Sequence, residues 1–364
     1  MNHCDPQTGR TLALFRLAAG VVIFFSFVLS GALSASAQNS FSGRPVPILT
    51  GNAGYFTNVE DGHTVLSPTV NPVLLVPMGD RWLIEGRGEF EGDFERPDGG
   101  GPFRGTVDKE LNYLQADYIA NPHLTVTVGR FLTPFGMYNE RLYPIWIRSL
   151  PEEPLIFPIA TGSSDGLMFR GGFSLNAKAN LNYSTYFSAG TENHVLEADR
   201  LAGGRLGFFF PGPRIEVGGS WQKSLQEERA NAFGFHFAWQ PAAVPLNLRS
   251  EYARSNLGSG YWIAGAYRLS QLPFWQRAMR HTEVVLRAQQ FFAGEDLNDE
   301  EAEEYELPDA NARQADFGLN YYLRDGMKLT SSFGRQFSGD EDANLWTVGI
   351  AYRFAFPLGS LGAQ

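Results

Sequence analysis

Hydrophobic and polar residues alternate along most of this chain, and the pattern is clearest near its C-terminal end. Trp346, Val348, Ile350 and Tyr352 fall on one side of an extended segment, whereas Arg353 falls on the other. A period of two residues is that of a β-strand. The alternation predicts about sixteen strands, over residues 51–58, 66–76, 82–94, 110–120, 124–131, 166–175, 179–189, 201–210, 214–222, 231–239, 246–254, 261–269, 280–291, 312–323, 327–337 and 345–354.

Alternation also occurs in soluble β-sandwiches, so the connections and the aromatic residues decide between the two classes. Tight links alternate with long polar links, as periplasmic turns alternate with external loops in outer-membrane barrels. Six tryptophans are placed at predicted strand ends or in a turn, where interfacial aromatic belts lie: Trp82, Trp221, Trp239, Trp262, Trp275 and Trp346. We predict an all-β fold, a transmembrane antiparallel β-barrel with short periplasmic turns and long external loops.

The expected links fall into two sets. Tight links are expected near 77–81, 121–123, 176–178, 211–213, 240–245, 270–278 and 324–326. Long links are expected near 95–109, 132–165, 190–200, 223–230, 255–260, 292–311 and 338–344.

The composition agrees with a sheet that has one apolar and one polar face. Aromatic residues make up 14% of the chain, charged residues only 19%, and there are 40 glycines. The mean hydropathy is slightly negative, −0.20. A helical membrane protein would carry several long apolar runs, and a disordered chain would lack the aromatic content.

The N-terminal segment 1–37 has the features of a signal peptide. Arg10 and Arg16 precede an uncharged, mostly apolar stretch, and Ala35 and Ala37 supply a small-residue cleavage site. The alternative is an uncleaved anchor helix. Cleavage would leave residues 38–364 as one exported domain in the bacterial outer membrane. It would also remove Cys4, the only cysteine, so disulfides and Cys–zinc sites are excluded. The net charge of −10 disfavours binding to nucleic acid.

A resemblance to a known family rests on the layout and on one short motif. The longest link is third among the expected external loops, and the whole pattern resembles a Gram-negative outer-membrane porin. The stretch Gly129-Arg130-Phe131-Leu132-Thr133-Pro134-Phe135-Gly136 is similar to a strand-to-loop segment of the phosphate-selective porin O and P family. The resemblance implies a homotrimer in contact with outer-membrane lipid and lipopolysaccharide. It also implies anion uptake, but lysines are few, so phosphate specificity is not carried over.

The link 132–165 is the first candidate site, because it is much longer than a hairpin needs and too apolar for a solvated loop. We expect it to fold into the barrel and narrow the channel; the alternative is packing outside, against a neighbouring subunit. The expected constriction residues are Tyr138, Glu140, Arg141, Trp146, Arg148, Glu152 and Glu153.

The second candidate site is the lumen wall, where alternation turns equal numbers of acids and bases inward. Many of these are expected to form cross-strand ion pairs. The basic residues are Arg87, Arg170, Arg205, Arg249, Arg268, Arg287 and Arg353, and the acidic ones are Glu85, Glu89, Asp117, Glu216, Glu251, Glu283 and Asp316.

Other features favour simpler interpretations. The acidic segment 293–311 suits a solvated external loop, although its carboxylates could bind divalent cations that bridge lipopolysaccharide. The segment 162–166 matches the Gly-x-Ser-x-Gly pattern of hydrolases, but the pattern requires a strand before it and a helix after it. The histidines show no metal-ligand spacing, and no cofactor motif is present. We expect no metal site, no cofactor and no enzymatic activity.

The function that the sequence favours is passive diffusion of small hydrophilic solutes or ions through a water-filled channel. A substrate-selective channel for anions or sugars is the alternative within transport. A barrel hydrolase or a surface anchor is the alternative from another class.

Overall fold

The computed structural model describes residues 46–360, apart from 98–100, 192–197, 227–228, 296, 325 and 340. The predicted signal peptide, residues 1–37, lies outside the described residues. No helix among the described residues is both long enough and apolar enough to cross a membrane.

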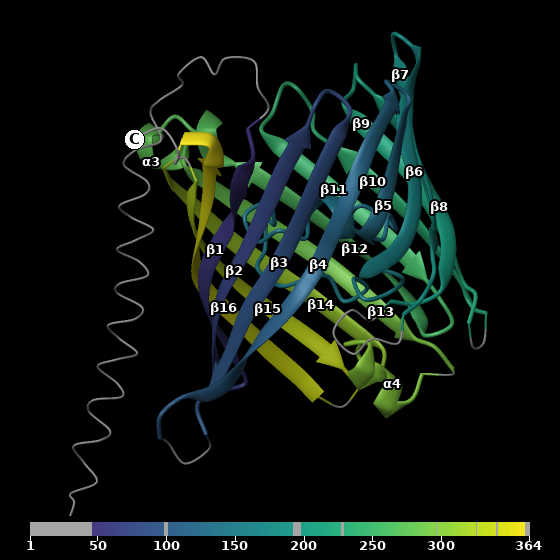
Figure 1. Cartoon of the computed structure of the whole chain (residues 1–364). Helices are drawn as coiled ribbons and strands as arrows, with labels where there is room; N and C mark the ends of the chain where they lie inside the picture. Colours follow the sequence, from purple (N-terminus) through teal and green to yellow (C-terminus); the bar gives the residue numbers. More distant parts are fainter. Residues whose placement is uncertain are drawn as a thin grey trace, which may run out of the picture. The chain divides into compact units, whose positions relative to one another are not determined.

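The described chain forms a closed antiparallel barrel of sixteen strands, each paired with its neighbours in sequence (Figure 1). The barrel closes where the first strand pairs with the last. The strands are β1 (Ile48–Glu60), β2 (His63–Met78), β3 (Trp82–Glu95), β4 (Arg104–Asn121), β5 (Leu124–Leu132), β6 (Ser163–Asn176), β7 (Ala179–Ser188), β8 (Leu201–Phe210), β9 (Ile215–Ser224), β10 (Asn231–Trp239), β11 (Leu246–Arg254), β12 (Gly258–Arg268), β13 (Thr282–Ala293), β14 (Ala312–Arg324), β15 (Met327–Ser338) and β16 (Glu341–Pro357).

The predicted fold class and strand number are confirmed, but several strands are longer than expected. β4 begins at Arg104, inside the link expected at 95–109, and β16 begins at Glu341, inside the link expected at 338–344. In both places polar residues interrupt the outer face of the strand: Lys109 on β4, and Asp342 and Asn344 on β16. The apolar half of the alternation is lost there, although backbone pairing with the neighbouring strand continues.

The connections divide between two ends of the barrel. The loop end carries the longest, 133–162 and 294–311, the second of which contains helix α4 (Asp299–Glu304). The turn end carries the β2–β3, β4–β5, β6–β7 and later turns. The tight link expected at 270–278 is wrong, because residues 269–281 contain η2 (Leu269–Gln271) and α3 (Gln276–Met279). A last short helix, η3 (Leu358–Ser360), follows β16.

The outer face of the barrel is apolar, as alternation predicts. Phe235 is 63% exposed, Trp346 53% and Val348 51%, while Thr347 between the last two is 3% exposed. Trp262, expected in an interfacial aromatic belt, faces the interior instead and is 3% exposed. It alternates with the outward Tyr261 and Ile263, so its position along β12 turns it inward.

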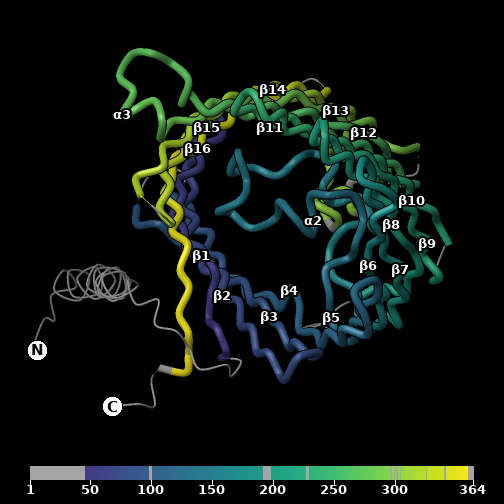
Figure 2. Tube along the Cα trace, turned by 90° about the horizontal axis from the view of Figure 1, so that it is seen from above, coloured from purple at the N-terminus to yellow at the C-terminus, as the bar shows by residue number. Residues whose placement is uncertain are grey.

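The interior of the barrel is partly filled by the chain itself. Figure 2 shows the connection between β5 and β6 inside the ring of strands, with helix α2 (Tyr138–Arg141) near the wall. The largest cluster of buried apolar residues combines residues of this connection with residues of β10 to β13. The hydrophobic core therefore lies between connection and wall.

Candidate functional site

The connection 133–162, named here the inner loop, is closed at its base by hydrogen bonds between its two ends. The Thr133 amide donates to the Gly162 carbonyl at 3.0 Å. The Asn139 Nδ2 donates to the carbonyls of Thr133 and Gly162, at 3.0 and 2.9 Å. The motif that precedes it joins two strands, since Arg130 lies 3.0 Å from Asp165. The inner loop thus leaves the wall as a closed lobe.

One face of the inner loop packs against the wall through apolar side chains. Phe135, Tyr138 and Ile156 are buried against Trp262 and Phe291. The Tyr138 ring meets those of Phe157 and Trp262 edge-on, with centroids 5.1 and 6.2 Å apart. Burial of this kind stabilises the loop position by roughly 25 cal/mol per Å² of apolar surface removed from water.

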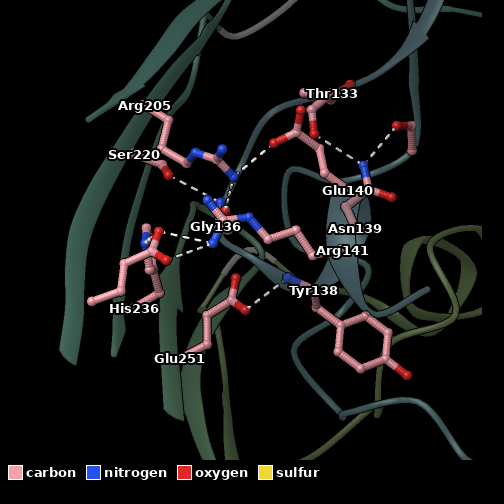
Figure 3. A network of polar contacts seen from close by, with 12 residues as sticks. Thr133, Gly136, Tyr138, Asn139, Glu140, Arg141, Arg205, Ser220, His236 and Glu251 are labelled. Atoms are coloured by element: carbon pink, nitrogen blue, oxygen red, sulfur yellow. Dashed lines mark hydrogen bonds and ion pairs between the residues drawn. The ribbon is translucent and has the colours of Figure 1, made fainter. Parts of the chain in front are cut away.

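Polar side chains of β8 to β11 hold the first turn of the inner loop (Figure 3). Arg205 Nη1 donates to the Gly136 carbonyl at 2.8 Å and lies 2.6 Å from the Glu140 carboxylate. Ser220 Oγ accepts the Gly136 amide at 3.0 Å, and Glu251 accepts the Tyr138 amide at 3.3 Å. Gly136 has φ +62 and the Glu251 carboxylate against it, so a side chain there would be strained and would clash.

A second contact on this side joins Arg141 to the wall. Its Nη1 lies 2.8 Å from both carboxylate oxygens of Glu216. His236 Nε2 lies 3.5 Å from the same carboxylate (Figure 3). The arrangement satisfies a lumen-facing acid with a base from the inner loop.

The far part of the inner loop is held by β13 to β15. Lys328 Nζ donates to the carbonyls of Ile145, Trp146 and Arg148, at 3.2, 3.4 and 2.7 Å. Asn320 Nδ2 donates to the Ser149 carbonyl at 2.8 Å, and Arg287 Nη1 to the Glu152 carbonyl at 2.8 Å. Because Arg287 and Asn320 lie within their strands rather than at the ends, the inner loop crosses the interior well inside the barrel.

Tyr143 lies on the edge of the inner loop that faces away from β13 to β15, and several charged side chains contact it. The guanidinium carbons of Arg87 and Arg148 lie 4.8 and 5.1 Å from the centroid of its ring. Its hydroxyl donates to Glu89 on β3 at 2.9 Å. Arg148 also pairs with Glu153 at 2.8 Å. This edge therefore presents a rigid, charged border.

A cavity of about 1150 Å³ lies beside that border and is lined by strands β1 to β4, β15 and β16 and by the 294–311 loop. Asn58 and Phe56 of β1, Ser67 of β2, and Tyr143 and Phe157 of the inner loop belong to its lining. Its ionisable lining is strongly acidic, with Arg148 as the basic member. The acidic members are Glu60, Glu89, Glu91, Asp93, Asp108, Glu110, Glu152, Glu153 and Glu306.

The predicted constriction residues separate into two groups. Arg148, Glu152 and Glu153 line the cavity. Tyr138, Glu140, Arg141 and Trp146 contact the wall and do not line the cavity. Glu152 does both, since Ser332 on β15 donates to its carboxylate at 2.6 Å. Trp146 packs with Phe56 and Ile145 and has the Arg353 guanidinium 5.6 Å from its ring centroid.

The predicted wall residues mostly have partners. Arg287 pairs with Asp316, and Arg170 with Asp117, each at 2.8 Å. Glu251 and Arg205 bind the inner loop, and Arg87 lies against Tyr143. Arg249 lines a small pocket beside Tyr138 and Trp262.

Several site residues were missed by the sequence analysis. Glu91 and Asp93 follow Glu89 at two-residue spacing, so strict alternation would have found them. Asp108 and Glu110 lie in or beside the stretch expected as a link. Lys328 gave no signal, because a buried lysine on a strand is recognisable only when the carbonyls that receive it are in place.

The hydrolase-like pattern has no exposed nucleophile. Ser164 lies in β6, is fully buried, and shares a hydrogen bond of 2.8 Å with Thr133. Within the described ranges, no three or more His, Asp or Glu side chains are grouped as a metal ion requires.

Comparison with solved structures places the fold among outer-membrane barrels. The chain is similar to OmpF of Salmonella typhi in complex with daunomycin, with 13% identity, a TM-score of 0.57 and coverage of 85% of this chain and 98% of the other. It is similar to an anion-selective porin from Comamonas acidovorans, with 11% identity, a TM-score of 0.54 and coverage of 85% and 100%. It is similar to the trimer form of OmpT, an outer membrane protein of Vibrio cholerae, with 11% identity, a TM-score of 0.52 and coverage of 85% and 100%. No protein-family model and no curated sequence matches the chain.

Proposed function

We propose that this protein is an outer-membrane porin, through which small hydrophilic solutes or ions diffuse passively. The channel is the space left beside the inner loop, and the inner loop sets its width. The observation that carries the proposal is the fixation of the inner loop across the interior of a closed barrel, next to a cavity of about 1150 Å³. Diffusion through such a space requires no catalytic group and no cofactor.

The membrane assignment rests on the outer face. A closed barrel satisfies every backbone group of its strands internally, which is what a lipid environment requires. The large apolar side chains on the outside suit acyl chains, and the polar interior suits water. In the proposed orientation the turn end is periplasmic, the loop end meets lipopolysaccharide, and residues 1–37 direct export and are cleaved.

A homotrimer is part of the proposal, supported by the trimer form of the Vibrio cholerae protein with this fold. The likeness to the phosphate-selective porin O and P family is limited to the short motif 129–136. We do not extend it to phosphate transport, because the cavity is lined by carboxylates, which repel phosphate.

Planar-bilayer recording tests the proposal directly. Protein refolded in detergent, whose barrel is verified by a heat-dependent shift in electrophoretic mobility, should give discrete conductance steps that are linear with voltage. Folded protein that inserts into the bilayer without any conductance would contradict a porin and would favour a surface anchor.

A further inference from the structure

Five carboxylates, Glu89, Glu91, Asp93, Asp108 and Glu110, form what we call the acidic ladder on β3 and β4. Glu89 is directly opposite Glu110 in the strand register, and Glu91 is opposite Asp108. All five line the cavity. Like charges directly opposite each other destabilise an antiparallel pair. The barrel therefore keeps this arrangement against a cost in stability, whereas the ion pairs elsewhere on its wall avoid such a cost.

Nearby bases offset the charge of the acidic ladder only in part. Arg130 acts electrostatically on Glu110 but pairs with Asp165 at 3.0 Å. Within the part of the chain that the structure describes, the ion pair made by Glu89 is with Arg87, at 3.6 Å, and Arg87 is itself stacked on Tyr143. The cavity's basic side chain, Arg148, is paired with Glu153. Three other wall arginines are paired with acids: Arg205 with Glu140, Arg287 with Asp316 and Arg170 with Asp117.

A second observation, independent of charge, concerns unpaired acceptor atoms around the cavity. Asn112 is 2% exposed and donates its Nδ2 to Glu89 at 3.0 Å, while its Oδ1 has no hydrogen-bond partner among the residues that the structure describes. Asn139 is 1% exposed, and its Oδ1 is also unpartnered. Both residues line the cavity. A buried oxygen of this kind requires a hydrogen-bond donor. Ammonium and guanidinium groups supply donors without bringing an acceptor.

From these observations we infer that the channel is selective for cations. The acidic ladder and Asn112 together form a binding site for small organic cations that bear an ammonium or guanidinium group. Rings and rows of carboxylates select cations in channels. A narrow space with low-dielectric walls strengthens their field. The rings of Tyr143 and Phe157 also line the cavity, and they would contact the aliphatic part of a solute the size of a basic amino acid. This inference rests on the proposed porin function.

The test uses a variant with three substitutions, Glu91→Gln, Asp108→Asn and Glu110→Gln. Removing repulsion across β3 and β4 should leave the barrel at least as resistant to heat as the wild type. A matched control removes three exposed acids of the 294–311 loop that do not line the cavity, by Glu295→Gln, Glu300→Gln and Glu303→Gln.

The measurements are reversal potentials across a potassium chloride gradient, and then with argininium chloride and potassium glutamate as a size-matched pair. Wild type and control should prefer K⁺ over Cl⁻ several-fold, pass argininium more readily than glutamate, and show K⁺ current reduced by added argininium. The ladder variant should lose most of the preference and the block. Equal permeability to K⁺ and Cl⁻ in the wild type, or equal loss in ladder variant and control, would overturn the inference while leaving the porin in place. Absence of conductance would overturn both.

Discussion

The two sides of the barrel interior use charge in opposite ways. On β8 to β15, bases and acids bind the inner loop or each other, as Arg205 binds Gly136 and Glu140 and as Lys328 binds three loop carbonyls. Toward the loop end of β3 and β4, carboxylates are opposite carboxylates and border a cavity. The difference indicates that the covered side fixes the inner loop, whereas the open side determines which solutes pass.

The largest expected effect comes from removing most of the inner loop, which the covered side of the wall binds. Replacing residues 138–158 with a short Gly-Ser linker should raise single-channel conductance several-fold, because the inner loop would no longer occupy the lumen. The hydrogen bonds between Thr133 and Gly162 and between Thr133 and Ser164 stay outside the excised stretch. Bilayer recording measures the change, and heat-modifiable mobility verifies the barrel. Unchanged conductance of a folded variant would show that the inner loop does not limit permeation.

A second experiment places an arginine at two adjacent positions of β3. At one position the arginine faces the cavity and can form an ion pair, as bases do on the covered side; at the other it faces outward. Glu91→Arg would face Asp108 across β3 and β4, and should fold normally while losing cation preference. Phe90→Arg places the same charge on the outer face, where Phe90 is 44% exposed. Arginine on the lipid face costs roughly 2–4 kcal/mol near the midplane and less toward the interfaces. At this position it would also lie opposite Lys109 in the strand register, and like charges there add to the cost. The yield of barrel folded into vesicles should fall for Phe90→Arg alone. Equal yields would contradict the assignment of the two faces.

The sequence predicted the barrel well because each strand carries its own evidence. Alternation within β10 or β16 needs no information from elsewhere in the chain, and sixteen such segments define the closed sheet. Prediction was weaker where one face stopped being apolar, as in the first part of β4. Trp262 was misplaced for a different reason. Its residue type suits a membrane interface, but the alternation that turns Arg268 inward also turns Trp262 inward.

The inner loop illustrates what a sequence leaves undetermined. Its apolar residues required shelter, but not a particular wall. Which loop residues meet the wall and which meet the cavity depends on contacts between distant segments, such as Lys328 with Ile145 or Glu251 with Tyr138. The sequence predicted equal numbers of inward acids and bases, but it did not show that they are unevenly distributed around the wall. Ion pairing between strands determines which of these charges can act on a solute.

A smaller effect should follow from removing one contact between the covered side and the inner loop. Lys328→Met removes the ammonium that three loop carbonyls accept, and leaves those carbonyls unsatisfied. The barrel should assemble, while open-channel current noise rises and mean conductance increases less than twofold. Lys178→Met, in the β6–β7 turn, serves as the control and should behave as the wild type. Identical noise in both variants would show that Lys328 does not hold the inner loop.

The smallest expected effect is the response of cation preference to pH, and it tests whether the inner loop's own carboxylates act with the acidic ladder. Burial raises the pKa of Glu153, and the negative charges of Glu89 and Glu306 add to the rise, against Arg148 and Arg287. A raised pKa means that Glu153 takes up a proton at a higher pH than an ordinary glutamate, whose pKa is about 4.3. Protonation of Glu153 removes a negative charge from the cavity and leaves Arg148 without its ion-pair partner.

The preference for K⁺ over Cl⁻ should therefore weaken as the pH falls, and the decline should begin above the pH range in which an ordinary glutamate titrates. In Glu153→Gln the preference at neutral pH should be lower from the start, and the decline between neutral and mildly acidic pH should be smaller than in the wild type. Reversal potentials recorded from neutral to mildly acidic pH measure both curves. Curves of the same shape for the wild type and Glu153→Gln would show that the field at the cavity comes from β3 and β4 alone.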